Sequence, residues 1–291
     1  MIEAYLIHLL IIIGIYIILA VSLNLAIGYT GLLNLGHIAF FGIGAYVSAL
    51  LSVNTKLPFL LIFIVAGFLA SIFGYILMAA TNKLKGDYLA LATLGFNFVI
   101  YSLFLNWTSL TRGPLGIPGI PRPSIFGLII QSNFAYLTFV AIVCCLSVGF
   151  LYLLVKSPYG TLLQATRDNE LACKVLGKNT FKIKWQALAV SAFFAGIAGS
   201  LYAHYITFID PSSFSLYEII LILTIVLIGG LASLKGSIIA TIIILLIPEI
   251  LRFLALPSSI LGPTRQIIYA LILILILMFR PRGLFGKVDL N

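Results

Sequence analysis

The residues of this chain that could carry out chemistry are few, and none forms a catalytic pattern. The chain has 291 residues, of which 17 are basic and 8 are acidic. A phosphate-binding loop requires G-x-x-x-x-G-K-[ST], because its backbone amides cradle the phosphates. Gly177-Lys178 is followed by Asn179, and Ala172 occupies the position of the first required glycine. We therefore expect neither a nucleotide site nor an enzyme activity here, and no metal or other cofactor in this chain.

A second set of polar residues is suited to binding a transported molecule. Residues 24–46, NLAIGYTGLLNLGHIAFFGIGAY, contain five glycines within an apolar stretch, and residues 228–236, IGGLASLKG, interrupt another. Transporters often build substrate sites where helices are discontinuous, because unwound backbone offers free N–H and C=O groups. The alternative is close packing by glycine beside an interfacial loop. The candidate pathway residues are Asn34, His37, Gly42, Thr93 and Asn97.

The charged stretch TRDNELACKVLGKNTFKIK, residues 166–184, predicts a separate amphipathic helix. Ser157-Pro158 is typical of a helix start and Gly177 of a stop. Glu170 and Lys174 form a favourable i,i+4 pair. One alternative is a helix lying on anionic lipid; docking to a soluble partner accounts better for the mixed charges. The predicted apolar face comprises Leu162, Ala165, Asn169, Ala172 and Leu176.

The elements that must position these residues are membrane spans. The chain is 62% hydrophobic and 9% charged, with a mean hydropathy of +1.19. This composition indicates an all-α polytopic membrane protein, because a soluble fold is roughly 25% charged. We expect one transmembrane domain over residues 1–291, with a cytoplasmic loop at 156–185. The nine predicted spans are 4–27, 38–53, 58–80, 88–105, 134–155, 186–206, 217–231, 237–255 and 265–280.

The distribution of basic residues predicts the orientation. With nine spans, twelve of the 17 basic residues fall on the side that includes 156–185 and five on the other. Basic residues concentrate on the cytoplasmic side of membrane proteins, so we expect the N-terminus outside and the C-terminus cytoplasmic. The segment 28–37 has no basic residue and is either a loop or a re-entrant break. The net charge of +9 then needs no nucleic-acid partner.

Two further patterns concern packing and energy supply. Small residues recur at Ser191, Ala195, Gly199 and Ala203, a spacing that lets membrane helices approach closely. The Pro/Gly-rich segment 111–123 predicts an ordered, non-helical crossing on the outer side, either a connector or a docking surface. No predicted span carries a central charged residue, which argues against ion-driven coupling and for energy supplied by another protein.

Seven motifs in order along the chain resemble the permeases of branched-chain amino acid ABC importers, and the LivM-type subunit more than the LivH-type. They are GYTGLLNLGHIAFFGIGAY, GDYLALATLGF, LTRGPLGIPGIPRP, SPYGTLLQATRDNELACKVLGKN, VSAFFAGIAGSLYA, IGGLASLKGS and RPRGLFG. The chain departs from the family pattern at Asn97, where an acidic residue is frequent, and at Ala232 and Lys235, where Gly and Trp are frequent.

The resemblance implies a multi-pass subunit of the bacterial inner membrane. It would pair with a second, LivH-type permease, with two cytoplasmic ATPases that bind ATP and Mg²⁺, and with an extracytoplasmic substrate-binding protein. Urea- or amide-type permeases of the same family and a stand-alone secondary transporter are the alternatives. By the same resemblance the residues that couple to an ATPase would be Arg167, Asp168, Asn169, Glu170, Ala172, Leu176 and Gly177.

Overall fold

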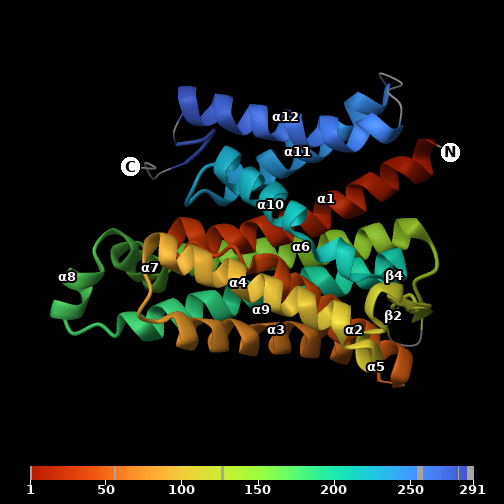
Figure 1. Ribbon diagram of the computed structural model, residues 1–291, viewed down its shortest axis with the longest axis horizontal. Coiled ribbons are helices and arrows are strands. Elements are labelled where there is room, and N and C mark those ends of the chain that lie inside the picture. Colours follow the sequence, from red (N-terminus) through yellow and green to blue (C-terminus); the bar gives the residue numbers. More distant parts are fainter. Residues whose placement is uncertain (1, 56, 126–127, 254–257, 281, 287–291) are drawn as a thin grey trace.

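The computed structural model describes residues 2–55, 57–125, 128–253, 258–280 and 282–286, and it is built largely of helices. In Figure 1 the long helices run between two ends of the molecule, one carrying α7 and α8 and the other carrying α5 and the short strands. The helices are α1 (Ile2–Asn24), α2 (His37–Asn54), α3 (Phe59–Thr81), α4 (Gly86–Asn106), α5 (Thr108–Thr111), α6 (Asn133–Lys156), α7 (Pro158–Asp168), α8 (Glu170–Val175), α9 (Thr180–Ile206), α10 (Leu216–Gly229), α11 (Leu234–Phe253) and α12 (Ser258–Phe279).

Within the described residues, seven helical stretches are long and apolar enough to cross a membrane. Helices are the form expected for such stretches, because every backbone polar group in lipid must be satisfied internally. The seven correspond to the first seven of the nine predicted spans. Helices α11 and α12 overlap the last two, and residues 254–255 of the eighth lie outside the described residues. The seven are Glu3–Tyr29, His37–Asn54, Phe59–Thr81, Gly86–Asn106, Asn133–Lys156, Thr180–Ile206 and Pro211–Gly229.

Helix α9 is the central element of the bundle and packs against α2 and α3. Its small residues bring the backbones together: a Cβ atom added at Gly199 would collide with the carbonyl oxygen of Phe41, and one at Gly44 with the backbone of Gly196. The predicted close-packing surface is confirmed, and its partner helices belong to the same chain. The buried small residues are Ser191, Ala192, Ala195, Gly196, Gly199, Ser200 and Ala203.

The Pro/Gly-rich segment 111–123 is not a span, as predicted. It forms a short 3-10 turn at Gly113–Leu115 and then pairs with the strand that follows α9. This pairing fixes the segment against the end of the central helix. The strands are β1 (Ile117–Pro118), antiparallel to β4 (Phe208–Ile209), and β2 (Ser124–Ile125), antiparallel to β3 (Leu128–Ile129).

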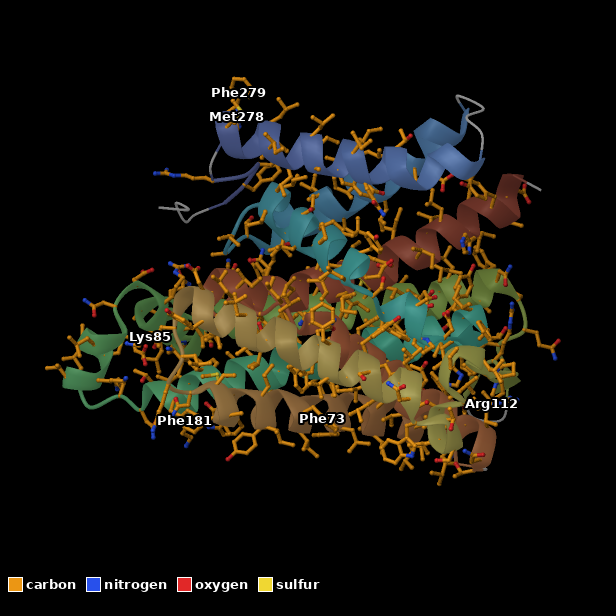
Figure 2. The ribbon with its side chains drawn as sticks, in the orientation of Figure 1. Phe73, Lys85, Arg112, Phe181, Met278 and Phe279 are labelled. Carbon is orange, nitrogen blue, oxygen red and sulfur yellow. The ribbon has the colours of Figure 1, made fainter. Side chains whose placement is uncertain are left out.

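The two ends of the bundle differ in what they present. Figure 2 places Lys85 at the end that carries α7 and α8, and Arg112 at the opposite end beside the strands. Helix α1 begins at the strand end, whereas α12 ends, at Phe279, toward the end that carries α7 and α8 (Figures 1 and 2). Helices α10, α11 and α12 form a layer beside α1.

The close approach of α9 and α2 predicts a contrast between two glycines. Gly199→Ala should destabilise the fold by about 1–3 kcal/mol, because the added methyl group overpacks against the Phe41 carbonyl. Gly149→Ala in α6 has open space around the added atom and should be neutral or stabilising by up to about 1 kcal/mol. Thermal unfolding of the two variants in detergent measures the difference, and equal midpoints would contradict the packing described here.

Candidate functional site

The first break in the helical bundle follows α1. The chain forms a π-helical turn at Leu25–Tyr29 and then has no regular helix until α2 begins at His37. Most of this segment is buried, including Asn34 and Gly36, while Gly31 is exposed. The segment is therefore a buried interruption between two helices and not a solvated loop.

Asn24 joins this first break to a second one, residues 230–233, between α10 and α11. The Asn24 side chain is fully buried. Its Nδ2 donates to the carbonyl oxygens of Gly230 (3.2 Å) and Ser233 (3.1 Å) and to Ser237 Oγ (2.7 Å), and its Oδ1 accepts from the Ala232 amide at 3.0 Å. One side chain thus satisfies backbone groups that the second break would otherwise leave unpaired.

The second break is also closed by the end of the chain. The amides of Leu284 and Phe285 donate to the carbonyl oxygens of Ile228 (2.8 Å) and Gly229 (3.1 Å). Ala232 takes a φ of 59°, in the left-handed region that favours glycine. The backbone groups of this break are used internally, so the break offers a packing junction more than an open binding surface.

The predicted pathway residues of the first break and of α4 come together in part. The hydroxyl of Thr93 accepts from the Leu35 amide at 2.9 Å, and Asn34 Oδ1 accepts from the Gly36 amide at 3.0 Å. Asn97 lies one helical turn after Thr93 on the same buried face of α4. Asn34, Thr93 and Asn97 are each 2% exposed, so the structure brings polar groups from two separated segments to one buried region.

Three of these buried side chains have polar atoms without a hydrogen-bond partner in the described structure: Asn34 Nδ2, Asn97 Oδ1 and His37 Nδ1. The other ring nitrogen of His37, Nε2, lies 3.0 Å from Ser22 Oγ and 3.2 Å from the Leu19 carbonyl oxygen. Unpaired buried polar groups are rare because each costs about 1–3 kcal/mol. Asn34 Nδ2 and Asn97 Oδ1 make the region beside Thr93 suited to a ligand that brings both an acceptor and a donor, while the polar contacts of His37 are with α1.

Gly42 does not belong to this polar group. A Cβ atom there would lie 2.7 Å from Phe104 Cε2 and 3.2 Å from the ring of Phe214. The glycine makes room for an aromatic cluster in which Phe104 and Tyr46 stack at 4.1 Å between ring centroids. The structure therefore separates Gly42 from the other four candidates and gives it a packing contact.

The prediction of one continuous helix between Ser157 and Leu176 is wrong. It breaks at Asn169, whose extended backbone separates α7 from α8 and whose Oδ1 accepts from the Ala172 amide at 2.9 Å. Ser157 does not cap through its side chain, since its hydroxyl donates to the Leu154 carbonyl oxygen instead. Gly177 does end α8, with a φ of +75° and a bond from its amide to the Lys174 carbonyl oxygen.

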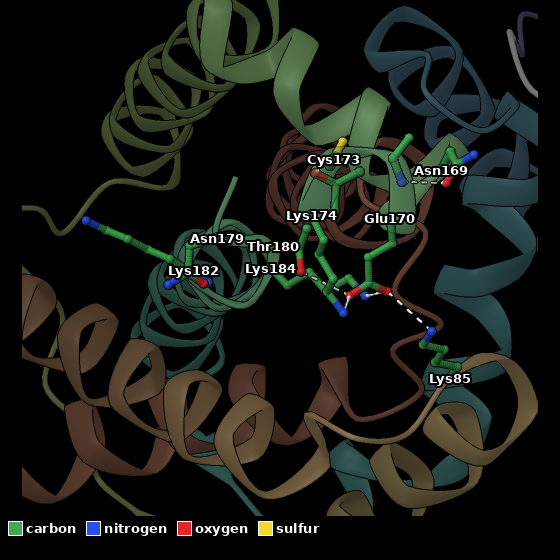
Figure 3. A network of polar contacts seen from close by, with 11 residues as sticks. Lys85, Asn169, Glu170, Cys173, Lys174, Asn179, Thr180, Lys182 and Lys184 are labelled. Carbon is green, nitrogen blue, oxygen red and sulfur yellow. Dashed lines mark hydrogen bonds and ion pairs between the residues drawn. The ribbon is translucent and has the colours of Figure 1, made fainter. Parts of the chain in front are cut away.

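Glu170 anchors α8 to its surroundings (Figure 3). Its carboxylate contacts Lys174 at 3.0 Å, which confirms the predicted i,i+4 pair, and Lys184 of α9 at 2.7 Å. Lys85 lies 3.9 Å away, and the Thr180 hydroxyl donates at 3.1 Å. Partial burial would raise the pKa of Glu170, but the hydrogen bonds from Lys184 and Lys174 outweigh it and lower the pKa to about 2.

The outer surface of α8 is apolar, although the predicted face is not the one observed. Cys173 is buried, while Ala172 is exposed beside three large apolar side chains. A row of exposed apolar residues outside the bilayer is unusual on a chain that stands alone and marks a contact surface. We call this surface the α8 face; its members are Leu171, Ala172, Val175 and Leu176, the large ones exposed by 72%, 81% and 76% in chain order.

Arg167 and Asp168, at the end of α7, differ in their contacts and in their exposure. The Arg167 guanidinium pairs with Asp168 Oδ1 at 2.8 Å and donates from Nη1 to the Gly28 carbonyl oxygen at 2.7 Å. The side chain of Arg167 is 15% exposed, against 64% for Asp168. Asp168 thus lies at the surface, whereas Arg167 reaches inward to the first break.

An apolar groove of about 1110 Å³ lies between α3, α6 and α9, away from the polar residues just described. Its walls include Phe63, Phe150 and Phe193, and Trp185 and Gln186 lie at one end of it. Since this surface faces outward at the level of the spans, it is suited to lipid or to another helix and not to a polar molecule in transit.

Comparison with known proteins decides the family. The family profile described as "Branched-chain amino acid transport system / permease component" matches residues 5–279. The chain belongs to this family. It is a permease component of a branched-chain amino acid transport system, a membrane subunit that is not itself catalytic. A stand-alone secondary transporter is therefore no longer an alternative.

Relatives of both subunit types are similar to the chain. The high-affinity branched-chain amino acid transport system permease protein LivM of Escherichia coli K12 is 36% identical over 294 residues, covering 93% of this chain and 67% of that protein. A probable LivM of Methanocaldococcus jannaschii is 25% identical over 318 residues, covering 94% and 91%. LivH of Salmonella typhimurium is 25% identical over 302 residues, covering 95% and 92%. No solved structure was found to match the chain.

Two contributors were missed at the level of sequence. Asn24 was recognisable as a polar residue in an apolar stretch, but its partners lie more than 200 positions away. Leu171 and Val175 are not in the predicted apolar face, because a continuous helix from Ser157 places their side chains on another side. The signal that could have corrected this is Asn169 itself, since Asn is among the strongest helix N-caps.

The carboxylate network predicts that α8 depends on Glu170. Glu170→Gln should increase hydrogen exchange of the α8 amides about tenfold, because the ion pairs to α9 are lost. Since the folded-state pKa is lowered, the stabilisation is present at neutral pH and is lost as the pH falls from about 4.5 toward 2. Asp87→Asn, at an exposed carboxylate near the same end, is the control, and equal exchange in both variants would contradict the anchoring role.

Proposed function

We propose that this permease is the LivM-type subunit of an ATP-driven importer of branched-chain or closely related amino acids. It pairs with a LivH-type permease, two cytoplasmic ATPases that hold ATP and Mg²⁺, and an extracytoplasmic binding protein. The observation that carries the proposal is the α8 face, an exposed apolar surface on an anchored segment outside the spans. It is supported by the similarity to LivM along 93% of the chain.

The α8 face is suited to receiving force from an ATPase. Its apolar side chains are free to enter a groove on a partner, while the partly buried carboxylate of Glu170 holds the segment to α9 and prevents it from turning independently. Asp168 and Asn169 flank the face at the surface, and Gly177 fixes its end. We assign Glu170 and Arg167 to holding the segment and the α8 face itself to the ATPase contact.

The orientation proposed is nine spans with the N-terminus outside and the C-terminus cytoplasmic. The arrangement in Figure 1 supports this, because the basic segment of α7 and α8 and the end of α12 lie at one end and the start of α1 at the other. The Pro/Gly-rich segment and the strands then face the binding protein. The LivH-type partner is supported by the family, in which LivH relatives are also similar to this chain.

The α8 face predicts a selective loss of ATPase binding. Val175→Asp should reduce co-purification of the ATPases and substrate uptake at least about tenfold, because it places a charge in an apolar interface, at a cost of about 2 kcal/mol or more. Leu115→Asp at the opposite end is the matched control for ATPase co-purification, since Leu115 is 75% exposed and Val175 is 81% exposed. Its uptake is left out of the comparison, because Leu115 lies in the segment proposed to face the binding protein. The comparison requires normal membrane levels of both variants. ATPase binding that survives Val175→Asp would argue against docking at α8.

We propose that substrate passes the polar region formed by Asn34, His37, Thr93 and Asn97. The unpaired donor at Asn34 Nδ2 and the unpaired acceptors at Asn97 Oδ1 and His37 Nδ1 are complementary to the carboxylate and ammonium groups of an amino acid. The same atoms would be costly in a purely structural role. Alternating access at this region, driven from α8, is the mechanism we propose.

The unpaired oxygen of Asn97 allows a clean test of the path. Asn97→Leu should lower uptake about tenfold without destabilising the fold, because a lost substrate hydrogen bond is worth about 1–2 kcal/mol while no internal bond to Oδ1 is broken. Asn106→Leu on the same helix is the control, since Asn106 is exposed and bonds only to Ser102. Uptake rates and unfolding midpoints are measured together; unchanged uptake in Asn97→Leu would leave the region with a packing role.

A further inference from the structure

The helices α7 and α8, which contact the ATPase in the proposed function, are called the coupling segment (residues 158–175). Arg167 lies where this segment meets the first break. It belongs to the last turn of α7, directly before the extended residue Asn169 that separates α7 from α8. A long cationic side chain at this position would be expected to point into solvent. Instead it is 15% exposed and directed toward the π-helical turn after α1.

The contact between Arg167 and the first break is specific in two ways. Nη1 donates to the Gly28 carbonyl oxygen at 2.7 Å, and the last carbonyls of a helix lack partners within the helix. The aliphatic part packs on Gly31: a Cβ atom there would lie 2.9 Å from Arg167 Cγ, and Gly31 has a φ of +69°. The guanidinium is held in place by Asp168 Oδ1 at 2.8 Å.

The π-helical turn that Arg167 contacts also touches the second break and leads to the polar region with Asn34 and Thr93. A Cβ atom at Gly28 would collide with the Ala232 amide, so the two breaks touch at this residue. Asn24, one turn earlier, bonds to the same Ala232 amide. In the other direction the segment continues to Asn34 and Gly36 beside Thr93. The turn at Gly28 therefore contacts the second break directly and is continuous with the segment that carries Asn34.

We propose that Arg167 is a positioning residue that transmits movement of the α8 face to the first break, and so couples ATP hydrolysis in the partner subunits to opening of the path. The inference rests on the proposed function but assigns Arg167 a role different from ATPase contact. Its charge and fork geometry both matter, because the guanidinium must hold Asp168 and the Gly28 carbonyl at the same time. Lysine supplies the charge without the fork.

The test uses the full complex, reconstituted in proteoliposomes with its ATPases and binding protein. The measured quantity is the number of ATP molecules hydrolysed per substrate transported. Arg167→Gln should assemble with the ATPases and hydrolyse ATP, but the ratio should rise about tenfold, within the range of typical coupling effects. Arg167→Lys should give a smaller rise, and Lys83→Gln, an exposed lysine at the same end, should give none.

The outcomes separate this inference from the proposed function. An unchanged ratio in Arg167→Gln overturns it, as does loss of ATPase binding, which would make Arg167 a docking residue. If Arg167→Gln does not reach the membrane, Arg167→Lys and Asp168→Ala decide by the same ratio, because each keeps a positive charge at position 167 and weakens the contact that the Arg167 guanidinium makes. If the wild-type complex transports without ATPases, the proposed function fails, whatever these variants do.

Discussion

Backbone polar groups inside an apolar bundle must find partners, and this constraint shapes the molecule wherever a helix is interrupted. The second break depends on one buried side chain from α1. The Asn24 side chain uses its donor and acceptor groups on the second break, and holds Ala232 in a left-handed conformation that an alanine would otherwise avoid. Close contact at Gly28 then joins the two breaks into one unit. Helix α9 packs against α1 and against the π-helical turn of the first break.

The coupling segment has polar contacts on its inner side and an apolar surface on its outer side. Polar contacts hold it from within: an ion pair from Glu170 to Lys184 binds α8 to α9, and a hydrogen bond from Arg167 to the Gly28 carbonyl oxygen binds α7 to the first break. Its outer surface is apolar and uncovered in the chain by itself. The inner polar contacts keep α7 and α8 ordered, and the outer apolar face leaves a surface for a partner. A segment with both properties can transmit a movement of the partner to the bundle. Three of the charged side chains in residues 166–184, those of Arg167, Glu170 and Lys184, therefore serve internal contacts.

Hydropathy and small-residue spacing predicted the helical class, the interface of α9 and nine spans, of which the first seven are confirmed within the described residues. Each of these depends on local composition. The break at Asn169 was not predicted, because the helical spacing of apolar residues continues from α7 into α8. In the structure α7 ends at Asp168, and Asn169 caps the start of α8. Asn34, Thr93 and Asn97 were predicted as a group and lie in one region, whereas Gly42 serves an aromatic cluster. The Asn24 and Arg167 contacts join residues far apart in the chain, and no local pattern encodes such a pairing.

The docking of residues 282–286 on the end of α10 also orders events during synthesis. A Cβ atom at Gly230 would collide with Gly286, and the amides of Leu284 and Phe285 bond to carbonyl oxygens of α10. Residues 282–286 follow α12 in the chain and are therefore synthesised after every helix described here, yet the turn that they close also receives Asn24 from α1. The junction of α1, α10 and residues 282–286 is therefore complete only after residues 282–286 have been made.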